Sequence, residues 1–275
     1  MPMVEISQKW AACIVYFNDP QSLELLVEDL SLQNSKPELI FICDNNSVKP
    51  VQIKNKSNIE ITTLAENKGF GTAANTAIKK AIQSGFENII LFSQDVRLHD
   101  LDATKKLIHE LSKQSSMAYP TMLNRKTNKV FSKGGSLNFL TGRIYLNTKA
   151  NAKKKYWADG SCLAFSSQVF KTIKGFDETY FMYFEDVDFC YRAIKNNFKL
   201  IHVPVEVSQN PNGPSALLRS RNSVKFAKKV NKWFLLVVIK RNFIGALKLF
   251  LQLDFVSGKE RIRGIRLGLK ADARN

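Results

Sequence analysis

Cysteine is scarce in this sequence. The 275 residues include four, Cys13, Cys43, Cys162 and Cys190, and they lie far apart. Their spacing is not the paired spacing of a zinc site, and their density is far below that of a small disulfide-stabilised domain. We therefore expect four reduced and mostly buried thiols.

Long apolar runs are also missing. The longest, "WFLLVVI" at Trp233 to Ile239, is far shorter than the roughly 20 residues that a membrane-spanning helix needs. The N-terminus lacks the pattern of a signal peptide, because Glu5, Gln8 and Lys9 precede the first apolar run. The sequence predicts a cytoplasmic protein without a transmembrane helix.

Acidic residues are absent between Ser215 and Leu253. The segment 215–275 has fifteen Lys or Arg against three acids, hence +12 of the total net charge of +17, which leaves +5 for residues 1–214. Apolar and basic residues alternate within it: Trp233, Phe234, Lys240, Arg241, Phe243, Leu247, Lys248, Phe250 and Leu251. This pattern favours helices that lie in a membrane interface near anionic headgroups. The alternative is helices packed on the rest of the chain with a solvated basic face.

The same charge leaves a second class of function open, a binding protein for nucleic acid or for an anionic membrane. The sequence contains no zinc finger, helix-turn-helix or RNA-binding aromatic motif. Its positive charge is concentrated in one terminal segment. We therefore rank this class below an enzyme.

Hydrophobic residues make up 44% of the chain, enough for the core of one large domain or two small ones. Short β-rich runs at 11–17, 39–43, 59–64 and 88–93 alternate with helical patterns at 22–32, 72–84 and 101–115. This alternation predicts a parallel sheet covered by helices. The stretch 119–155 has a weaker pattern and is predicted to be irregular or to form weak strands.

Polar residues follow three of these predicted strands, and ligands of such sheets bind at the carboxyl ends of the strands. Asp95 is either a turn residue or a ligand for Mg²⁺ or Mn²⁺. Asp44 is either a cap or an acceptor for a nucleobase or ribose hydroxyl. Gly69 and Gly71 suit ordinary turns or a phosphate-binding loop, although "NKGFGTAAN" is neither G-x-G-x-x-G nor a Walker sequence.

The stretch "FMYFEDVDFC" places Glu185, Asp186 and Asp188 directly after bulky rings. One interpretation is the start of a helix, where acids complement the helix dipole. The other is a catalytic site, because apolar walls raise the proton affinity of a carboxylate and prepare it as a general base. Spacing alone does not separate the two.

Five motifs, in order, resemble the family 2 inverting glycosyltransferases of the GT-A fold, and most closely their bacterial rhamnosyltransferase-like branch. They are "CDNNS", "ENKGFGTAANTAI", "SQD", "DGSCLAF" and "GFDETYFMYFEDVDFCYR", and the resemblance covers about residues 14–204. It implies a Rossmann-like, mostly parallel central sheet flanked by helices. We expect residues 1–214 to be the catalytic domain and residues 215–275 to be a basic amphipathic helical tail in contact with a membrane surface or lipid acceptor.

The resemblance also implies roles for individual residues. Asp186 matches the catalytic base, Glu185 an orienting group beside it, and Asp95 the metal-binding acid. The implied donor nucleotide pocket contains Asp44, Asn67, Gly69, Gly71 and Asn75. The implied sugar and acceptor pocket contains Trp157, Asp159, Gly160 and Tyr183. Candidates for contact with a diphosphate are Arg219, Arg221 and Lys229.

The implied reaction transfers a sugar from a nucleoside diphosphate to a hydroxyl during synthesis of a surface polysaccharide such as lipopolysaccharide. We favour dTDP-rhamnose as donor, with a UDP-hexose as second choice. The acceptor is a growing saccharide or a polyprenyl-diphosphate-linked one, met at the cytoplasmic face of the inner membrane. No nucleic-acid partner is expected.

Two positions depart from the family pattern. Ser93 replaces the usual first Asp of the metal motif, and Ser208, Gln209 and Asn210 occupy the region where the family commonly has a His. His202 lies too early in the chain to replace it. Mg²⁺ or Mn²⁺ is still the expected cofactor. A degenerate transferase stays an alternative, and so does a nucleotidyltransferase, although "YFNDP" differs from the glycine-rich loop that such enzymes carry after their first strand.

Overall fold

The computed structural model describes residues 9–53, 57–113, 116–149, 154–211, 213 and 215–271. Its first strands are β1 (Trp10–Tyr16), β2 (Leu39–Asp44), β3 (Ile59–Thr63) and β4 (Asn88–Ser93), as predicted. The helices between and after them are α1 (Pro20–Leu32), α2 (Phe70–Gln83) and α3 (Ala103–Lys113). The last two residues of the third predicted helix, 114 and 115, lie outside the described residues.

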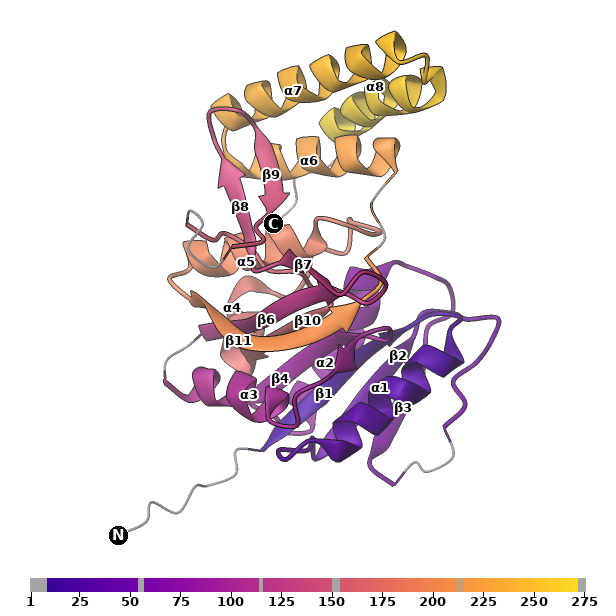
Figure 1. The fold of residues 1–275 in the computed structure, drawn as a ribbon, viewed down its shortest axis with the longest axis vertical. Helices are drawn as coiled ribbons and strands as arrows, with labels where there is room; N and C mark the ends of the chain where they lie inside the picture. Colours follow the sequence, from indigo (N-terminus) through magenta and orange to yellow (C-terminus); the bar gives the residue numbers. More distant parts are fainter. Residues whose placement is uncertain are drawn as a thin grey trace.

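One curled sheet organises the molecule (Figure 1), in the order β3-β2-β1-β4-β10-β6-β11-β5, with β7 paired to β6. The four strands β3, β2, β1 and β4 are parallel, as expected. The second half is mixed, because β10 (Cys162–Ser166) runs antiparallel to both β4 and β6 (Ser116–Asn124). The remaining strands of this sheet are β5 (Arg97–Leu98), β7 (Lys129–Ser132) and β11 (Lys199–Gln209).

The prediction of weak or irregular structure from residue 119 onward was wrong for β6. This strand has nine residues, and all but Asn124 are buried. Pro120 interrupts the sequence pattern because it cannot donate to a β-ladder. In the structure, it falls where the register with β11 shifts, between Tyr119 and Thr121.

The two faces of the sheet each bury a hydrophobic cluster, and β1 shows why the strands read as continuous apolar runs. Ala11, Cys13 and Val15 point into one cluster, whereas Trp10 and Ile14 belong to the other. A strand buried on both faces is typical of a sheet covered by helices on both sides. All four cysteines are free and buried, which confirms that prediction.

The second half of the chain builds a layer beside the sheet. It contains α4 (Ser167–Ile173), α5 (Glu185–Lys195) and a separate hairpin of β8 (Gly135–Asn138) and β9 (Arg143–Leu146). The chain continues with α6 (Ala216–Val230), α7 (Lys232–Leu251) and α8 (Phe255–Lys270). Figure 1 shows the hairpin rising from the sheet toward α7. Gly142 at its tip lies so close to α7 that an added Cβ would be 3.1 Å from the Val238 backbone.

The fold prediction is therefore confirmed in its α/β class and in its C-terminal helices. Within the described residues, none of the helices has the length and apolar character needed to cross a bilayer.

Candidate active site

A cleft of about 940 Å³ opens at the carboxyl ends of β1 and β4. Parallel strands deliver the residues that follow them to one edge of a sheet, which explains how distant segments meet here. Ten of the sequence-predicted residues line it: Asn67, Ser93, Asp95, Trp157, Asp159, Gly160, Tyr183, Glu185, Asp186 and Arg219. The structure thus brings Asp95 and Asp186 into one cleft.

Asp186 is held by two backbone amides. The N–H of Val187 donates to its Oδ1 at 2.7 Å, and the N–H of Gly160 donates to its Oδ2 at 3.2 Å. The approach to Gly160 is close, because a Cβ there would lie 3.0 Å from the Cβ of Asp186. Burial, and then the charge of Asp159, raise the pKa of Asp186 to about 7. The hydrogen bonds from the two backbone N–H groups act in the opposite direction and lower it. A carboxylate with this pKa is suited to accept a proton near neutrality.

Glu185 is almost fully buried beside it, with 7% of its surface exposed. Burial, and then the charge of Asp186, raise its pKa well above the usual value. Its Oε2 has no hydrogen-bond partner among the described residues. A buried carboxyl with one unsatisfied oxygen is available to bind a hydroxyl in the cleft.

Asp95 lies at the end of β4 and accepts two hydrogen bonds at Oδ1. Ser93 Oγ donates at 2.8 Å and Gln209 Nε2 at 3.1 Å. Gln209 belongs to the segment where the family pattern has a His, and it thus contacts Asp95. His202 does not line the cleft, and its Nε2 lies 2.9 Å from Thr121 Oγ1 instead.

Asp159 connects the two ends of the cleft electrostatically. Its Oδ1 accepts hydrogen bonds from the N–H of Ser161, at 2.9 Å, and from the hydroxyl of the same residue. Burial raises its pKa, and the charge of Asp95 adds to this increase. Asp159 in turn raises the pKa of Asp186. The cleft therefore holds a row of interacting carboxylates.

The segment after β3 is fixed to the segment after β2. Asn45 donates from Nδ2 to Asn67 Oδ1 at 2.9 Å and accepts from the N–H of Lys68 at 3.1 Å. Asn67 Oδ1 also accepts from the N–H of Gly69 at 3.0 Å. Gly69 has a φ of +88°, and a Cβ there would lie 1.8 Å from the carbonyl oxygen of Phe181. Only glycine fits that position.

Six sequence-predicted residues do not line the cleft, namely Asp44, Gly69, Gly71, Asn75, Arg221 and Lys229. Asp44 is 1% exposed, and its Oδ1 accepts from the N–H of Ser47 at 2.8 Å, which is the cap geometry that sequence analysis left open. Asn75 is bonded on both sides of its amide to the backbone of Phe176, at 2.9 and 2.8 Å. Arg221 donates to the carbonyl of Thr179 at 3.4 Å.

The wall formed by residues 181–184 is backbone-strained and held from outside the sheet. Tyr183 and Phe184 have φ values of +67° and +76°, a region that costs non-glycine residues about 1–3 kcal/mol each. Asn222 of α6, which is fully buried, donates from Nδ2 to the carbonyls of Met182 and Tyr183 at 2.9 and 2.8 Å. The N–H of Phe70 donates to the carbonyl of Phe181 at 3.0 Å. Helices α2 and α6 therefore hold this segment from both sides.

A buried ionic network ties α6 to α5. Lys229 Nζ lies 2.7 Å from Asp177 Oδ2 and 2.8 Å from Asp188 Oδ1, and Arg192 Nε lies 2.7 Å from Asp188 Oδ2. Lys225, which is fully buried, pairs with Asp177 at 3.2 Å. Lys229 is thus engaged in structural ion pairs, which corrects its assignment as a diphosphate contact. Asp188 belongs to the helix framework.

Sequence reasoning missed several residues that shape the cleft. Asn45 was quoted within "CDNNS" but was given no role. Gln94, Tyr145 and Gln209 also line the cleft. The polar residues directly after each strand were the available signal for Asn45 and Gln94. The sequence offered no comparable signal for Asn222, forty residues from its partner Met182.

Comparison with known protein families gives one family, described as "Glycosyl transferase family 2", which matches residues 11–186. The chain is 25% identical over 174 residues to "Low-salt glycan biosynthesis hexosyltransferase Agl10" of Haloferax volcanii, covering 59% of this chain and 55% of the relative. It is 22% identical over 200 residues to "dTDP-rhamnosyl transferase RfbF" of Shigella flexneri, covering 72% and 66%. A Mycobacterium tuberculosis "N-acetylglucosaminyl-diphospho-decaprenol L-rhamnosyltransferase" is 24% identical over 220 residues, covering 69% and 72%. The chain therefore spans less than two thirds of the length of the first two relatives.

Solved structures agree in fold. S. aureus TarS, residues 1–349, superposes with a TM-score of 0.60 at 16% identity, covering 94% of this chain and 81% of that one. The mannosyltransferase PcManGT of Pyrobaculum calidifontis, in complex with GDP-Man and Mn²⁺, gives a TM-score of 0.58 at 13% identity, covering 95% and 87%. At such identities, the likeness supports the fold alone.

Proposed function

The chain belongs to glycosyl transferase family 2, and from that premise we propose that it transfers a sugar from a nucleoside diphosphate to an acceptor hydroxyl, with inversion at the anomeric carbon. The observation that carries this proposal is the convergence of Asp95 and Asp186 in one cleft at the end of the sheet.

Asp186 acts as the general base in this proposal. As the acceptor oxygen attacks the anomeric carbon, its proton passes to the Asp186 carboxylate, and the bond from that carbon to the diphosphate breaks on the opposite face. A single displacement inverts the centre and requires no covalent intermediate. The amides of Gly160 and Val187 fix the direction of the carboxylate. Glu185 Oε2 is placed to bind a hydroxyl of the acceptor.

Trp157 and Tyr183 form the proposed sugar and acceptor pocket together with Asp159 and Gly160. Both rings line the cleft, and the indole Nε1 of Trp157 is buried without a hydrogen-bond partner among the described residues. Buried indole N–H groups usually have a partner. A sugar hydroxyl in the cleft would provide one.

Donor binding is assigned to the segments after β2, β3 and β4. Asn45 and Asn67 line the cleft at the end where Asp44, Gly69 and Gly71 shape the backbone. In this proposal, Asp44 and Asn75 support the nucleotide pocket through the turns that they hold. We favour dTDP-rhamnose as donor, with a UDP-hexose as second choice; the rhamnosyltransferase names of two relatives support that order.

A divalent cation fits the donor end of the cleft. Mg²⁺ and Mn²⁺ prefer oxygen ligands and are commonly bound by one or two carboxylates plus substrate phosphates. Asp95 and Asp159 supply carboxylates there, and Asn210 Oδ1 is a buried amide oxygen without a partner among the described residues. Within those residues, no three His, Cys, Asp or Glu side chains are grouped as a complete metal site. When bound, the cation would stabilise negative charge on the departing diphosphate.

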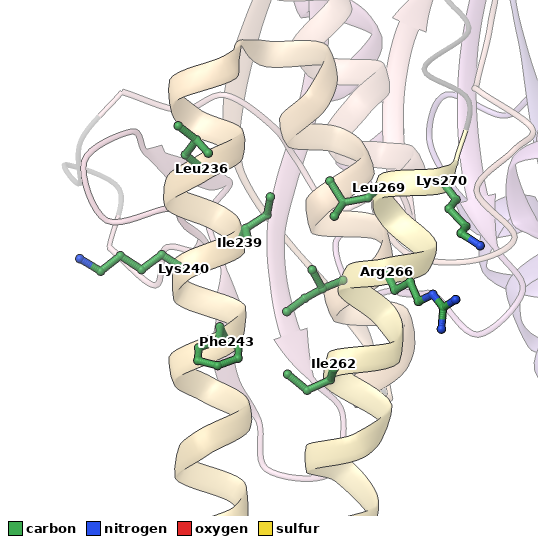
Figure 2. Close-up of a pocket in the computed structure, with 9 residues that line it drawn as sticks. Leu236, Ile239, Lys240, Phe243, Ile262, Arg266, Leu269 and Lys270 are labelled. Atoms are coloured by element: carbon green, nitrogen blue, oxygen red, sulfur yellow. The ribbon is translucent and has the colours of Figure 1, made fainter.

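The acceptor is proposed to be a lipid-linked or growing saccharide of a surface polysaccharide, and the helical tail 215–275 to bring the enzyme to a membrane. In Figure 2, Ile239 of α7 and Ile262 and Leu269 of α8 point into the space between the two helices. They line a groove of about 640 Å³ with Lys240, Arg266 and Lys270 at its borders. Apolar side chains bordered by cations suit an anionic membrane surface. We therefore propose peripheral association with the cytoplasmic face of the membrane.

A screen of purified protein against a panel of nucleotide sugars, with and without Mn²⁺, tests the proposed reaction. We expect release of the free nucleoside diphosphate from at least one donor, with rhamnose transfer strongest, and a matching loss in the Asp186→Asn variant. Equal release of the nucleoside diphosphate by the wild-type protein and this variant would contradict the assignment of the cleft as the active site.

A further inference from the structure

Four arginines from four different elements gather beside the cleft: Arg143 of β9, Arg219 of α6, Arg241 of α7 and Arg261 of α8. Arg219 lines the cleft itself. The hydroxyl of the next residue, Ser220, donates to the carbonyl of Arg261 at 2.8 Å, which places α8 against the start of α6.

Helix α7 completes the cluster. Arg261 Nε donates to Asn242 Oδ1 at 3.3 Å, and the guanidinium of Arg261 lies over Gly245, where an added Cβ would be 2.4 Å from its Cζ. On the other side, Gly142 packs on the backbone of Val238, one turn from Arg241. The hairpin tip therefore brings Arg143 toward Arg241.

Nothing acidic neutralises these guanidinium groups in the described part of the chain. None of the four is in an ion pair with a carboxylate there. The Arg241 side chain is exposed, but partial desolvation of its guanidinium lowers its pKa, and the positive charges of Arg143 and Arg219 lower it further. Burial also lowers the pKa of Arg261, and the positive charges of Arg219 and Arg241 lower it further. Mutual repulsion of this kind is relieved when an anion binds between the groups.

We propose that Arg143, Arg219, Arg241 and Arg261 form a binding site for a phosphate or diphosphate group carried by the acceptor. This inference rests on the proposed function and names the chemical class of its acceptor. Guanidinium groups bind phosphate oxygens through paired hydrogen bonds, so four of them suit a diphosphate.

The position of the cluster favours the acceptor over the donor. Only Arg219 reaches the cleft at the strand ends, and the other three lie on the hairpin and on α7 and α8, beyond the proposed donor pocket. Helix α7 also exposes large apolar side chains, with Trp233 63% and Leu236 61% exposed. An acceptor with a diphosphate and an apolar chain matches both surfaces.

Hexyl diphosphate is a soluble probe for this site. Binding is measured calorimetrically at physiological salt, with three comparison ligands: inorganic pyrophosphate for the head group alone, hexanol for the chain alone and UDP for the donor end. The cluster variant combines Arg241→Gln with Arg261→Gln. The matched control combines Lys259→Gln with Arg263→Gln, which removes the same charge from exposed positions of α8.

We expect hexyl diphosphate to bind more tightly than pyrophosphate, and hexanol not to bind measurably. The cluster variant should lose at least tenfold in affinity for hexyl diphosphate, with UDP affinity unchanged, whereas the control should stay within twofold. Because repulsion is relieved, the cluster variant should melt no lower than the wild-type protein. If it does melt lower, Arg241→Gln alone, at an exposed side chain, gives the same comparison.

Three results would overturn the proposal: an equal loss in the control, a parallel loss of UDP affinity in the cluster variant, or no binding of hexyl diphosphate by the wild-type protein. The proposed function is judged separately by turnover of nucleotide sugars. Binding at the arginines without turnover would leave the site standing and reject the transferase reaction. Turnover of nucleotide sugars, together with unchanged binding of hexyl diphosphate by the cluster variant, would support the transferase reaction and reject the arginine site.

Discussion

At Asp186, two backbone amides and a neighbouring carboxylate act in opposite directions on one proton. The amides of Val187 and Gly160 favour the charged form, whereas burial and Asp159 favour the neutral form. The balance places the pKa at about 7, far above the value of about 3.9 for an exposed aspartate. The carboxylate, a very weak base in water, thus has the proton affinity that the proposed mechanism requires near neutral pH.

Replacing Asp186 with Asn should abolish turnover without loss of fold. General base catalysis commonly contributes about 10²–10⁴-fold, so activity should fall by at least that range. The raised pKa means that an ionised Asp186 destabilises the folded state above the unfolded pKa. At pH 8, the Asp186→Asn variant should therefore melt no lower than the wild-type protein.

Asp188→Asn is the matched control two residues away. It removes the carboxylate that pairs with Arg192 and Lys229, so it should lower the melting temperature. Asp186→Asn with near wild-type activity, or with a lower melting temperature than Asp188→Asn, would contradict the assigned roles.

The pH dependence of turnover provides a second test at this scale. The base must be deprotonated, so the turnover rate should rise with pH through about 7. Removing the negative charge of Asp159 with Asp159→Asn should move this rise to lower pH, because Asp159 raises the pKa of Asp186. A rise that stays in place or moves to higher pH would show that another group controls it.

At the scale of secondary-structure elements, α6 supports the segment that leads into the proposed catalytic residues. Asn222 donates hydrogen bonds to two carbonyls of the strained segment before α5. Further along the same helix, Lys225 pairs with Asp177 and Lys229 pairs with Asp188. The position of Asp186 therefore depends on a helix that follows the sheet in sequence. The domain boundary predicted after residue 214 stays a prediction, and contacts of α6 with Met182 and Tyr183 cross it.

The variant Asn222→Leu keeps the size of the side chain and removes both hydrogen bonds. We expect kcat to fall at least tenfold while the donor KM changes little, because the donor pocket lies on β2, β3 and β4. The rise of the turnover rate with pH through about 7, expected for the wild-type protein, should also be lost in this variant. Ser223→Ala, which removes a buried hydroxyl from the adjacent position of the same helix, should leave kcat within about twofold. Equal effects in both variants would indicate a structural role only.

The sequence predicts local elements and strand ends well in this protein. Strands β1, β2 and β4 have continuous apolar runs because both faces are buried, and Asp95, which follows β4, lines the cleft. The sequence does not reveal that β10 runs antiparallel or that Pro120 sits at a register shift in a buried strand. These features depend on pairing between segments distant in sequence.

The same limit applies to the site. Asp95, Asp159 and Asp186 were assigned from the family resemblance of their motifs, and the structure places all three in the cleft. Gln209 and Asn222 act through hydrogen bonds to residues 114 and 40 positions away. No local pattern encodes such contacts.

At the scale of the whole molecule, most of the net positive charge and most of the exposed large apolar side chains lie in the C-terminal segment that forms α6, α7 and α8. Trp233, Leu236, Phe243 and Leu247 of α7 are 63%, 61%, 50% and 47% exposed. Figure 1 shows this helix at the end of the molecule away from strands β1, β2 and β3. In our proposal, this layer of helices faces a membrane while the sheet carries the chemistry.

Sedimentation with lipid vesicles tests this orientation. The wild-type protein should bind anionic vesicles, bind neutral phosphatidylcholine vesicles weakly, and dissociate at high salt, because exposed charges are screened. The double variant Trp233→Ser with Phe243→Ser should lose most of this binding. Val48→Ser, at a side chain 91% exposed in the turn after β2, should bind as the wild-type protein does. Unchanged binding of the double variant would place the membrane contact elsewhere.

The anomeric configuration of the product tests the central claim most directly. NMR of the glycoside formed from the donor identified in the panel measures it. A base at Asp186 that deprotonates the acceptor for one direct displacement predicts a product of inverted configuration at the anomeric carbon. A product of retained configuration would contradict the account, because it would require a second displacement and a different role for this carboxylate.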